Sequence, residues 1–397
     1  MDDIVPIPQG FEFASHGAGL RYKDRDDLAL VYSKVPAVGA GVFTKNLFQA
    51  APVTVARENL SKAKTVRAVL LNAGQANACT GDQGLADCRE TLKLVGKGLG
   101  ISPGEILPAS TGVIGQQFDM AVWRREVPGL TAKLGQKTPL DLAKAIMTTD
   151  TYPKLAWESV DIGGQEVRVL GLAKGSGMIC PNMATMLGVV ICDAKIKPVK
   201  WREVLIAAVD GSFNAVTVDG DTSTNDCVLA LANAASGVEV DSPRDLAALG
   251  EAVSEVCRSL AYMVVEDAEG GTKIIRIKVD GAEDNMAAEA AARAVGNSPL
   301  VKTAMFGGDA NWGRIVAALG RSGADFDPNK VCVSIGQIPV FANGQPVAGD
   351  IDGLLAPRMR RAEISVEICL GQGDGEYLLL ASDLTCEYVR INADYRS

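Results

Sequence analysis

Histidine is almost absent from this chain of 397 residues, because His16 is the only one. This scarcity excludes a histidine-rich metal site. Any Ser–His or Cys–His catalysis would also have to use this one residue, which lies in a loop-like segment, 14–19. We expect His16 to be a solvated or capping residue. If the chain catalyses acyl transfer, its base is therefore expected to be a different group.

The nine cysteines are odd in number, and no two of them are spaced as CxxC. A disulfide framework or a zinc site is not expected, and most of these side chains are predicted to be small buried residues. No apolar run approaches the roughly 18–20 residues that a membrane span needs. The acidic start at 1–4, followed by Pro and Gly, fits neither a signal peptide nor a transit peptide. We therefore expect a cytoplasmic protein with no membrane partner.

Several common binding motifs are also missing. The glycines at 17–19 and 39–41 lack the third glycine of GxGxxG, and 171–177 does not end in GK[ST]. Asp219, Asp221 and Asp226 lack the offsets of a calcium loop, so we interpret them as turn-stabilising side chains. The net charge of −9 argues against a nucleic-acid partner and is compatible with a cationic small substrate. We expect no metal and no bound cofactor.

Hydrophobic periodicity predicts helices interleaved with short strands. Helices are expected over 81–98, from 119, from 139, over 199–213, from 243 and over 283–295. Strands are expected at 27–33, 37–44, 51–57, 66–71, 105–115 (with an embedded turn at 109–113), 160–172 (a hairpin), 186–192, 227–234, 273–279, 331–348 and 363–391. This order favours a layered α+β architecture, with sheets packed face to face and covered by helices. Composition marks no repeat and no domain boundary.

One Gly-rich stretch, 175–188, leads through Ala184 to Thr185 and then into an apolar run. By itself, Thr185 reads as a β-branched residue at the start of a buried strand. If the Ala184–Thr185 bond is cut, however, the new α-amine has an ordinary pKa of roughly 7.7–8.0. That amine could take a proton from the neighbouring hydroxyl, so that one residue supplies both nucleophile and base.

The stretch 174–187 resembles the autoprocessing site of the ornithine acetyltransferase (glutamate N-acetyltransferase) family of arginine biosynthesis. Further segments match that family in order along nearly the whole chain: 72–81, 110–112, 148–151, 218–226, 269–273, 309–314 and 388–397. Gly271 stands where the family commonly has alanine, and Ala73 and Gln75 vary one loop. These departures touch no proposed catalytic group.

The resemblance implies self-cleavage into an α chain, 1–184, and a β chain, 185–397, that stay associated as α2β2. The implied fold is a layered sandwich like that of N-terminal-nucleophile hydrolases, with different connectivity. The implied reaction is ping-pong: the acetyl group of N2-acetylornithine moves to Thr185, ornithine leaves, and glutamate accepts the acetyl group. Some members also use acetyl-CoA.

The same resemblance assigns roles to further residues. Thr111 and Gly112 correspond to the pair that stabilises the oxyanion, where a hydroxyl and a backbone N–H could converge. The substrate contacts correspond to Thr151, Lys174, Thr185, Glu269, Asn392 and Ser397. Lys174 would suit the α-carboxylate that both substrates carry. Glu269 would suit either the distal ammonium of ornithine or the orientation of the Thr185 amine.

Two other interpretations remain open at this level. The same nucleophile could pass the acyl group to water, as an amidohydrolase or aminopeptidase does. Alternatively, the chain could be a non-enzymatic or nucleotide-binding protein in which 175–188 is only a core strand. That last interpretation predicts a single band of 41.6 kDa on a denaturing gel.

Overall fold

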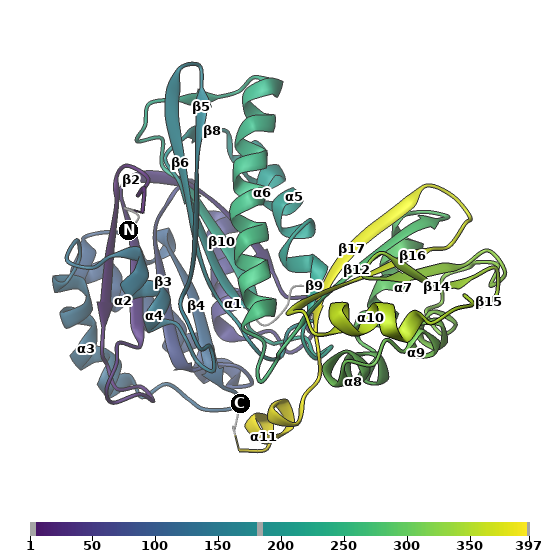
Figure 1. Ribbon diagram of the computed structural model, residues 1–397. Helices are drawn as coiled ribbons and strands as arrows, with labels where there is room; N and C mark the ends of the chain where they lie inside the picture. The colour runs from purple at the N-terminus through teal and green to yellow at the C-terminus, as the bar shows by residue number, and fades with distance from the viewer. Residues whose placement is uncertain (1–4, 181–185, 395–397) are drawn as a thin grey trace.

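The computed structural model describes residues 5–180 and 186–394. Two bodies of secondary structure, each with a hydrophobic core of its own, lie next to each other (Figure 1). The strands of the larger body are β1 (Phe11–His16), β2 (Leu28–Phe43), β3 (Val66–Gln75), β4 (Ile106–Val113), β5 (Lys154–Ile162), β6 (Gln165–Lys174), β7 (Leu187–Cys192), β8 (Lys195–Ile196), β10 (Cys227–Ala232) and β11 (Glu239–Val240). Its helices are α1 (Ala51–Lys62), α2 (Gly81–Leu99), α3 (Met120–Ala132), α4 (Pro139–Ala145), α5 (Pro198–Asp210) and α6 (Pro243–Glu266).

The long strand β2 joins two halves of the main sheet. Its first part pairs with β1 and β3, and its second part, 38–43, pairs with β10. The strand order in the described part of the chain is β4-β3-β2-β10-β7-β6-β5, with β1 also on β2. Strand β7 therefore lies inside the sheet, parallel to β10 on one side and antiparallel to β6 on the other.

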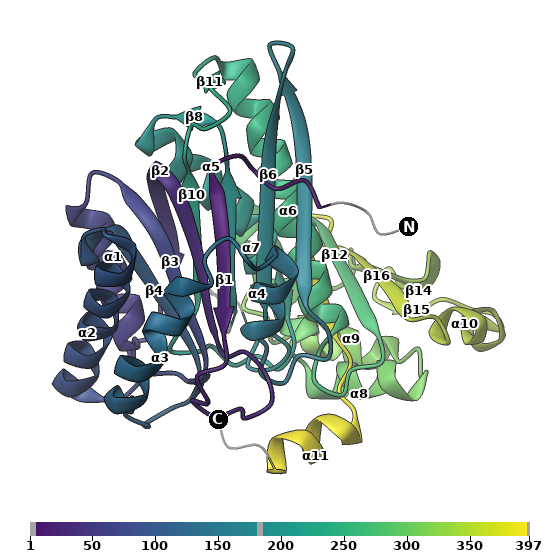
Figure 2. The same cartoon turned by 90° about the vertical axis from the view of Figure 1, so that its left-hand side faces the viewer.

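Side-chain alternation along these strands creates three apolar layers, since successive residues of a strand face opposite sides. Val69 and Leu71 of β3 share a central core with Leu187 and Val189 of β7, so the two halves of the sheet pack face to face. The opposite face of β3 packs with α2 and α3, and the opposite face of β7 packs with α5 and α6. Figures 1 and 2 show these helix pairs on either side of the strands. The expected layered α+β architecture is confirmed.

The smaller body is built around a second sheet, ordered β15-β14-β13-β16-β12-β17-β9 in the described residues. Its strands are β9 (Val216–Thr217), β12 (Ile274–Ala282), β13 (Cys332–Ile335), β14 (Ile338–Ala342), β15 (Gln345–Pro346), β16 (Glu363–Cys369) and β17 (Gly375–Ser382). Its helices are α7 (Asn285–Gly296), α8 (Pro299–Gly307), α9 (Trp312–Leu319) and α10 (Ile351–Met359), and the chain continues into α11 (Cys386–Asp394) beneath the larger body (Figure 1).

Two predicted strands are wrong. Residues 51–57 belong to helix α1, where Pro52 occupies a first-turn position that suits proline. The β-branched run Val53, Thr54 and Val55 favoured a strand in the sequence, but packing of the helix against the sheet overrides that preference. At the other end, 386–391 form helix α11 rather than a strand.

The single histidine differs from expectation, whereas the cysteines largely follow it. His16 ends strand β1, and its ring lies between Glu126 and Lys133 of the α3 region, at 2.9 Å from each. It is therefore a partly buried, paired side chain and not a solvated cap. Five cysteines are buried as predicted, but Cys79, Cys332 and Cys386 are exposed. Within the described residues, no helix is both long and apolar enough to cross a membrane.

Candidate active site

A small pocket collects most of the predicted site residues that the structure describes. Thr111 and Gly112 of β4, Lys174 at the end of β6, Glu269 after α6 and Asn392 of α11 all line it. These residues come from elements spread over almost the whole chain, and β7 begins beside them because Lys174 pairs with Leu187. Three predicted residues, Ala184, Thr185 and Ser397, lie outside the described residues.

The Thr111–Gly112 pair lies at the end of strand β4, and the turn predicted at 109–113 is absent: the strand continues to Val113. Gly112 has φ +131°, and a Cβ atom placed on it would lie 2.1 Å from the carbonyl carbon of Gly74. Only glycine fits this close approach between β3 and β4. The neighbouring Thr111 hydroxyl oxygen accepts a hydrogen bond from the Lys174 ammonium at 3.3 Å. Because Lys174 can only donate, the hydroxyl keeps its own proton for a further acceptor.

Lys174 is a buried lysine. Burial lowers its pKa, while the carboxylates of Asp150 and Glu269 favour its charged form. Asp150 accepts the Gly175 backbone N–H at 2.7 Å. Burial acts to raise the pKa of Asp150, but the ammonium groups of Lys174 and Lys154 outweigh it and lower that pKa to about 2. The negative charge of Asp150 therefore stays beside Lys174 at neutral pH.

A buried group of three charged side chains includes Asp150. Lys154 contacts Asp150 at 2.8 Å and Asp267 at 2.5 Å, and all three side chains are essentially inaccessible. Asp267 also accepts hydrogen bonds from the backbone N–H and the hydroxyl of Thr151. Thr151 is not among the residues that line the pocket; Thr148 and Thr149 are. The structure thus places Thr151 next to the site, on the far side of Asp267.

Glu269 connects the pocket to the end of the chain. Its carboxylate accepts a hydrogen bond from Asn392 of α11 at 2.8 Å, and its backbone N–H donates to Ser176 at 2.9 Å. A Cβ atom on Gly177 would lie 2.3 Å from the Glu269 carboxyl carbon, so this glycine leaves the space that the carboxylate occupies. The C-terminal helix is thereby tied to the Gly-rich stretch 175–178.

Sequence reasoning missed several pocket residues at the start of β10. Ser223, Thr224 and Asn225 line the pocket, and the adjacent Asp226 is fully buried. Asp226 accepts the backbone N–H of Met186, the residue after Thr185, at 3.0 Å. Asp219 does stabilise its turn, because it accepts the Asp221 N–H at 3.2 Å. It also accepts the N–H groups of the distant residues Met178 and Ile179, and the turn interpretation does not describe Asp226. A polar Asn–Asp pair directly before an apolar strand was the available signal.

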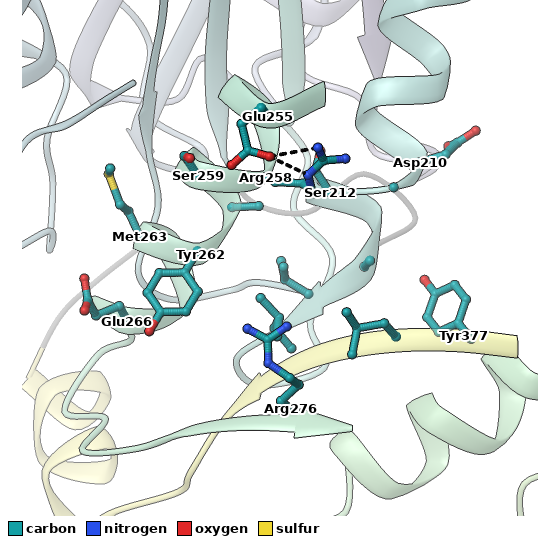
Figure 3. A pocket seen from close by; sticks show the side chains of 16 residues that line it. Asp210, Ser212, Glu255, Arg258, Ser259, Tyr262, Met263, Glu266, Arg276 and Tyr377 are labelled. Carbon is teal, nitrogen blue, oxygen red and sulfur yellow. Dashed lines mark hydrogen bonds and ion pairs between the residues drawn. The ribbon is translucent and has the colours of Figure 1, made fainter. Parts of the chain in front are cut away.

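A larger cavity of about 620 Å³ lies elsewhere, between α6 and β17 (Figure 3). Its charged groups already have protein partners: Arg258 pairs with Glu255 at 2.8 Å, and Arg276 pairs with Glu363 at 2.9 Å. Volume favours this cavity, but the convergence of polar groups and buried charges favours the small pocket as the chemical site.

Comparison with known proteins agrees with the predicted family. The model of the ArgJ family matches residues 12–397. The arginine biosynthesis bifunctional protein ArgJ of Nitratidesulfovibrio vulgaris is 59% identical over 390 residues, which cover 98% of this chain and 99% of that protein. The protein of the same name from Geobacter sulfurreducens is 46% identical over 391 residues, with 98% and 99% coverage.

Among solved structures, the arginine biosynthesis bifunctional protein argJ from Bacillus halodurans has 35% identity and a TM-score of 0.49. It covers 51% of this chain and 96% of its own. The sequence matches identify an acyltransferase of the ornithine acetyltransferase class. The chain belongs to the ArgJ family.

Proposed function

We propose that this chain cleaves itself at Ala184–Thr185 and then transfers an acetyl group from N2-acetylornithine to glutamate through an acetyl ester on Thr185. One observation carries the proposal: Thr111, Gly112, Lys174, Glu269 and Asn392 line one pocket beside the start of β7. The names of the relatives support a place in arginine biosynthesis. We place the reaction in the cytoplasm.

Self-cleavage would begin with attack of the Thr185 hydroxyl oxygen on the Ala184 carbonyl carbon. The C–N bond breaks, the nitrogen leaves as the Thr185 α-amine, and an ester joins Ala184 to the Thr185 oxygen. Water then hydrolyses this ester, so that Ala184 ends in a carboxylate and Thr185 regains its hydroxyl. The free amine beside that hydroxyl is the base that a protein with one remote histidine would otherwise lack.

The two products would remain together for a structural reason. Strand β7 of the 185–397 chain lies between β6 of the 1–184 chain and β10, and β10 in turn pairs with β2 of the 1–184 chain. Separating the chains would break two strand ladders and expose the central core. We propose that two such pairs form the α2β2 assembly.

Acetyl transfer needs donors for the oxyanion that forms on the acetyl carbonyl. The Thr111 hydroxyl is suited to this, because its oxygen accepts from Lys174 while its proton stays available. The Gly112 backbone N–H is the second donor. Ornithine leaves with a proton on its amine, and the amine of glutamate then attacks the Thr185 ester. Loss of one such donor typically lowers the rate by ~10²–10³-fold.

Substrate binding would use the remaining predicted residues. The Lys174 ammonium takes the α-carboxylate, and Glu269, held by Asn392, takes the distal ammonium of ornithine. The predicted contacts also include Ser397 and Thr151, although Thr151 does not line the pocket and its hydroxyl donates to Asp267. If Glu269 instead orients the Thr185 amine, Glu269→Gln will slow transfer with every acyl donor; if it binds ornithine, the variant will chiefly raise the KM for acetylornithine.

Intact-mass analysis of the purified protein tests the proposal. We expect two fragments that end at Ala184 and begin at Thr185, and we expect Thr185→Ala to remain one inactive chain. An active, uncut polypeptide of 397 residues would refute the mechanism. Two fragments from the Thr185→Ala variant would show that another residue drives cleavage.

The acceptor is decided by a second assay. Acetyl release from acetylornithine should require glutamate; equally fast release in its absence would identify the amidohydrolase alternative. The relatives are named bifunctional, and we extend this to acetyl-CoA as a second donor for glutamate. An acetyl-CoA assay with glutamate tests that extension separately.

A further inference from the structure

Two consecutive residues, Asn225 and Asp226, connect parts of the site that no backbone ladder joins directly. They lie at the start of β10, the strand that pairs with both β2 and β7. Asn225 is 6% exposed and Asp226 is 0% exposed. Asn225 lines the pocket and Asp226 is adjacent to it in sequence. Two buried polar side chains require partners to offset the cost of burial, so their contacts are informative.

Asn225 binds the strand that carries the expected oxyanion donors. Its side-chain amide donates to the carbonyl oxygen of Ala76 at 2.6 Å and to that of Ser110 at 2.8 Å. The Ser110 carbonyl belongs to the peptide group that leads into Thr111. The orientation of the amide is itself fixed, because the Thr224 hydroxyl donates to its oxygen at 2.7 Å.

Asp226 binds the strand that follows the expected cleavage site. Its Oδ1 accepts the Met186 backbone N–H at 3.0 Å, and the next residue, Cys227, donates its backbone N–H to the Met186 carbonyl at 3.2 Å. The Asp226 carbonyl also accepts the Thr44 N–H at 2.9 Å, which anchors the residue to the chain beyond β2.

The buried environment of Asp226 also fits a structural role at the start of β7. Burial raises its pKa well above the ordinary value, although the Met186 N–H, the Lys174 ammonium and Ser223 act in the opposite direction. Burial therefore shifts this carboxyl group toward its neutral form, and asparagine has a similar shape and keeps an oxygen that can accept the Met186 N–H.

We propose that Asn225 and Asp226 are positioning residues that fix the Thr111–Gly112 pair relative to the start of β7. The inference rests on the proposed function, in which Thr185 attacks the acetyl carbonyl carbon. Thr111 and Gly112 then donate hydrogen bonds to the negatively charged oxygen. A displacement of ~1 Å between such groups can reduce a rate by ~10²-fold while leaving substrate contacts intact.

The chain offers matched controls. Asn233, at the other end of β10, is also buried and donates its amide hydrogens to Gln9 and Ser33. Asp193, after the other end of β7, is buried and accepts the backbone N–H groups of Gln9 and Arg168. Alanine at either control position removes equivalent hydrogen bonds far from the pocket.

The test compares Asn225→Ala, Asn225→Asp, Asp226→Ala and Asp226→Asn with Asn233→Ala and Asp193→Ala. We expect Asn225→Ala, Asn225→Asp and Asp226→Ala to lower kcat for acetyl transfer at least tenfold, with KM changed less than twofold. Asp226→Asn should recover most of the rate, because its amide oxygen still accepts the Met186 N–H. The control variants should keep the wild-type kcat, even where their unfolding midpoints fall as much as those of the Asn225 and Asp226 variants.

Normal kcat in Asn225→Asp and Asp226→Ala would overturn the proposal, as would an equal loss in the controls. If Asp226→Asn is as impaired as Asp226→Ala, Asp226 is not a positioning residue. Amide hydrogen exchange supplies a readout that does not depend on the reaction: Met186 should exchange faster in Asp226→Ala than in Asp226→Asn. Unchanged exchange would refute the contact, whereas failure of the wild type to cleave or transfer would refute the proposed function.

Discussion

Replacing Gly112 with alanine gives the sharpest prediction from the geometry. The added Cβ would lie 2.1 Å from the Gly74 carbonyl carbon and 2.4 Å from its oxygen, whereas ordinary contacts begin at 3.4 Å. Because both neighbours are backbone atoms of β3, the residue must move by more than 1 Å, or β3 must. Its φ of +131° adds strain for any residue with a side chain.

The displacement sets the expected magnitude. A shift of this size in an oxyanion donor should lower kcat for acetyl transfer by ~10²-fold, with a smaller effect on KM. The assay is glutamate-dependent loss of acetylornithine, measured at saturating concentrations of both substrates. Thermal or urea unfolding of the same preparation checks that the variant is folded.

Gly115→Ala is the matched control. Gly115 also has a positive φ, +81°, but a Cβ atom there would meet nothing within 4 Å. It therefore introduces backbone strain of ~1–2 kcal/mol without a collision at the site. A Gly112→Ala variant within threefold of wild-type kcat would refute the argument from close approach. An equal loss of kcat in Gly115→Ala would show that backbone strain alone explains the loss in Gly112→Ala.

Three further changes test other contacts. Asp150 should stabilise the fold above about pH 4 and lose this contribution as the pH falls toward about 2, since its pKa is lowered from 3.8 to about 2. Asp150→Asn should therefore lower the free energy of unfolding by ~2 kcal/mol at pH 7. In the variant, the urea midpoint should also fall less steeply as the pH drops from about 4 to about 2; an unchanged pH dependence would contradict this. Gly177→Ala should displace the Glu269 carboxylate, 2.3 Å from the new Cβ, and raise the KM for acetylornithine; Gly250→Ala, with open space, should not. Removing 392–397 deletes the Asn392 hydrogen bond to Glu269 and should lower kcat/KM at least tenfold, and normal activity would exclude Asn392 and Ser397 from the site.

The sequence predicts helices well where hydrophobic periodicity and the residues typical of helix ends agree. Helix α2 shows apolar residues at 3-4 spacing, and Gly100 terminates it with a left-handed conformation. Helix α4 begins with Thr138 as cap and Pro139 after it, as the sequence indicates. Helix α1 does not follow from local pattern, because three β-branched residues in its first turns favour a strand.

The site was predictable only in part, because its decisive contacts join distant residues. The resemblance supplied Thr111, Gly112, Lys174, Glu269 and Asn392, which the fold brings to one pocket. Nothing local in the sequence shows that Asn225 binds Ser110, 115 positions earlier. Polar residues before a strand usually stabilise turns, and only the tertiary arrangement distinguishes a turn from a bridge between strands.

The length of β2 has a consequence for how the chain acquires its structure. A strand made from residues 28–43 must wait for β10, at 227–232, before its second half has a neighbour. More than half of the chain must therefore leave the ribosome before the main sheet closes. Such high contact order predicts slow folding, with the N-terminal strands exposed in the interval and open to chaperone binding.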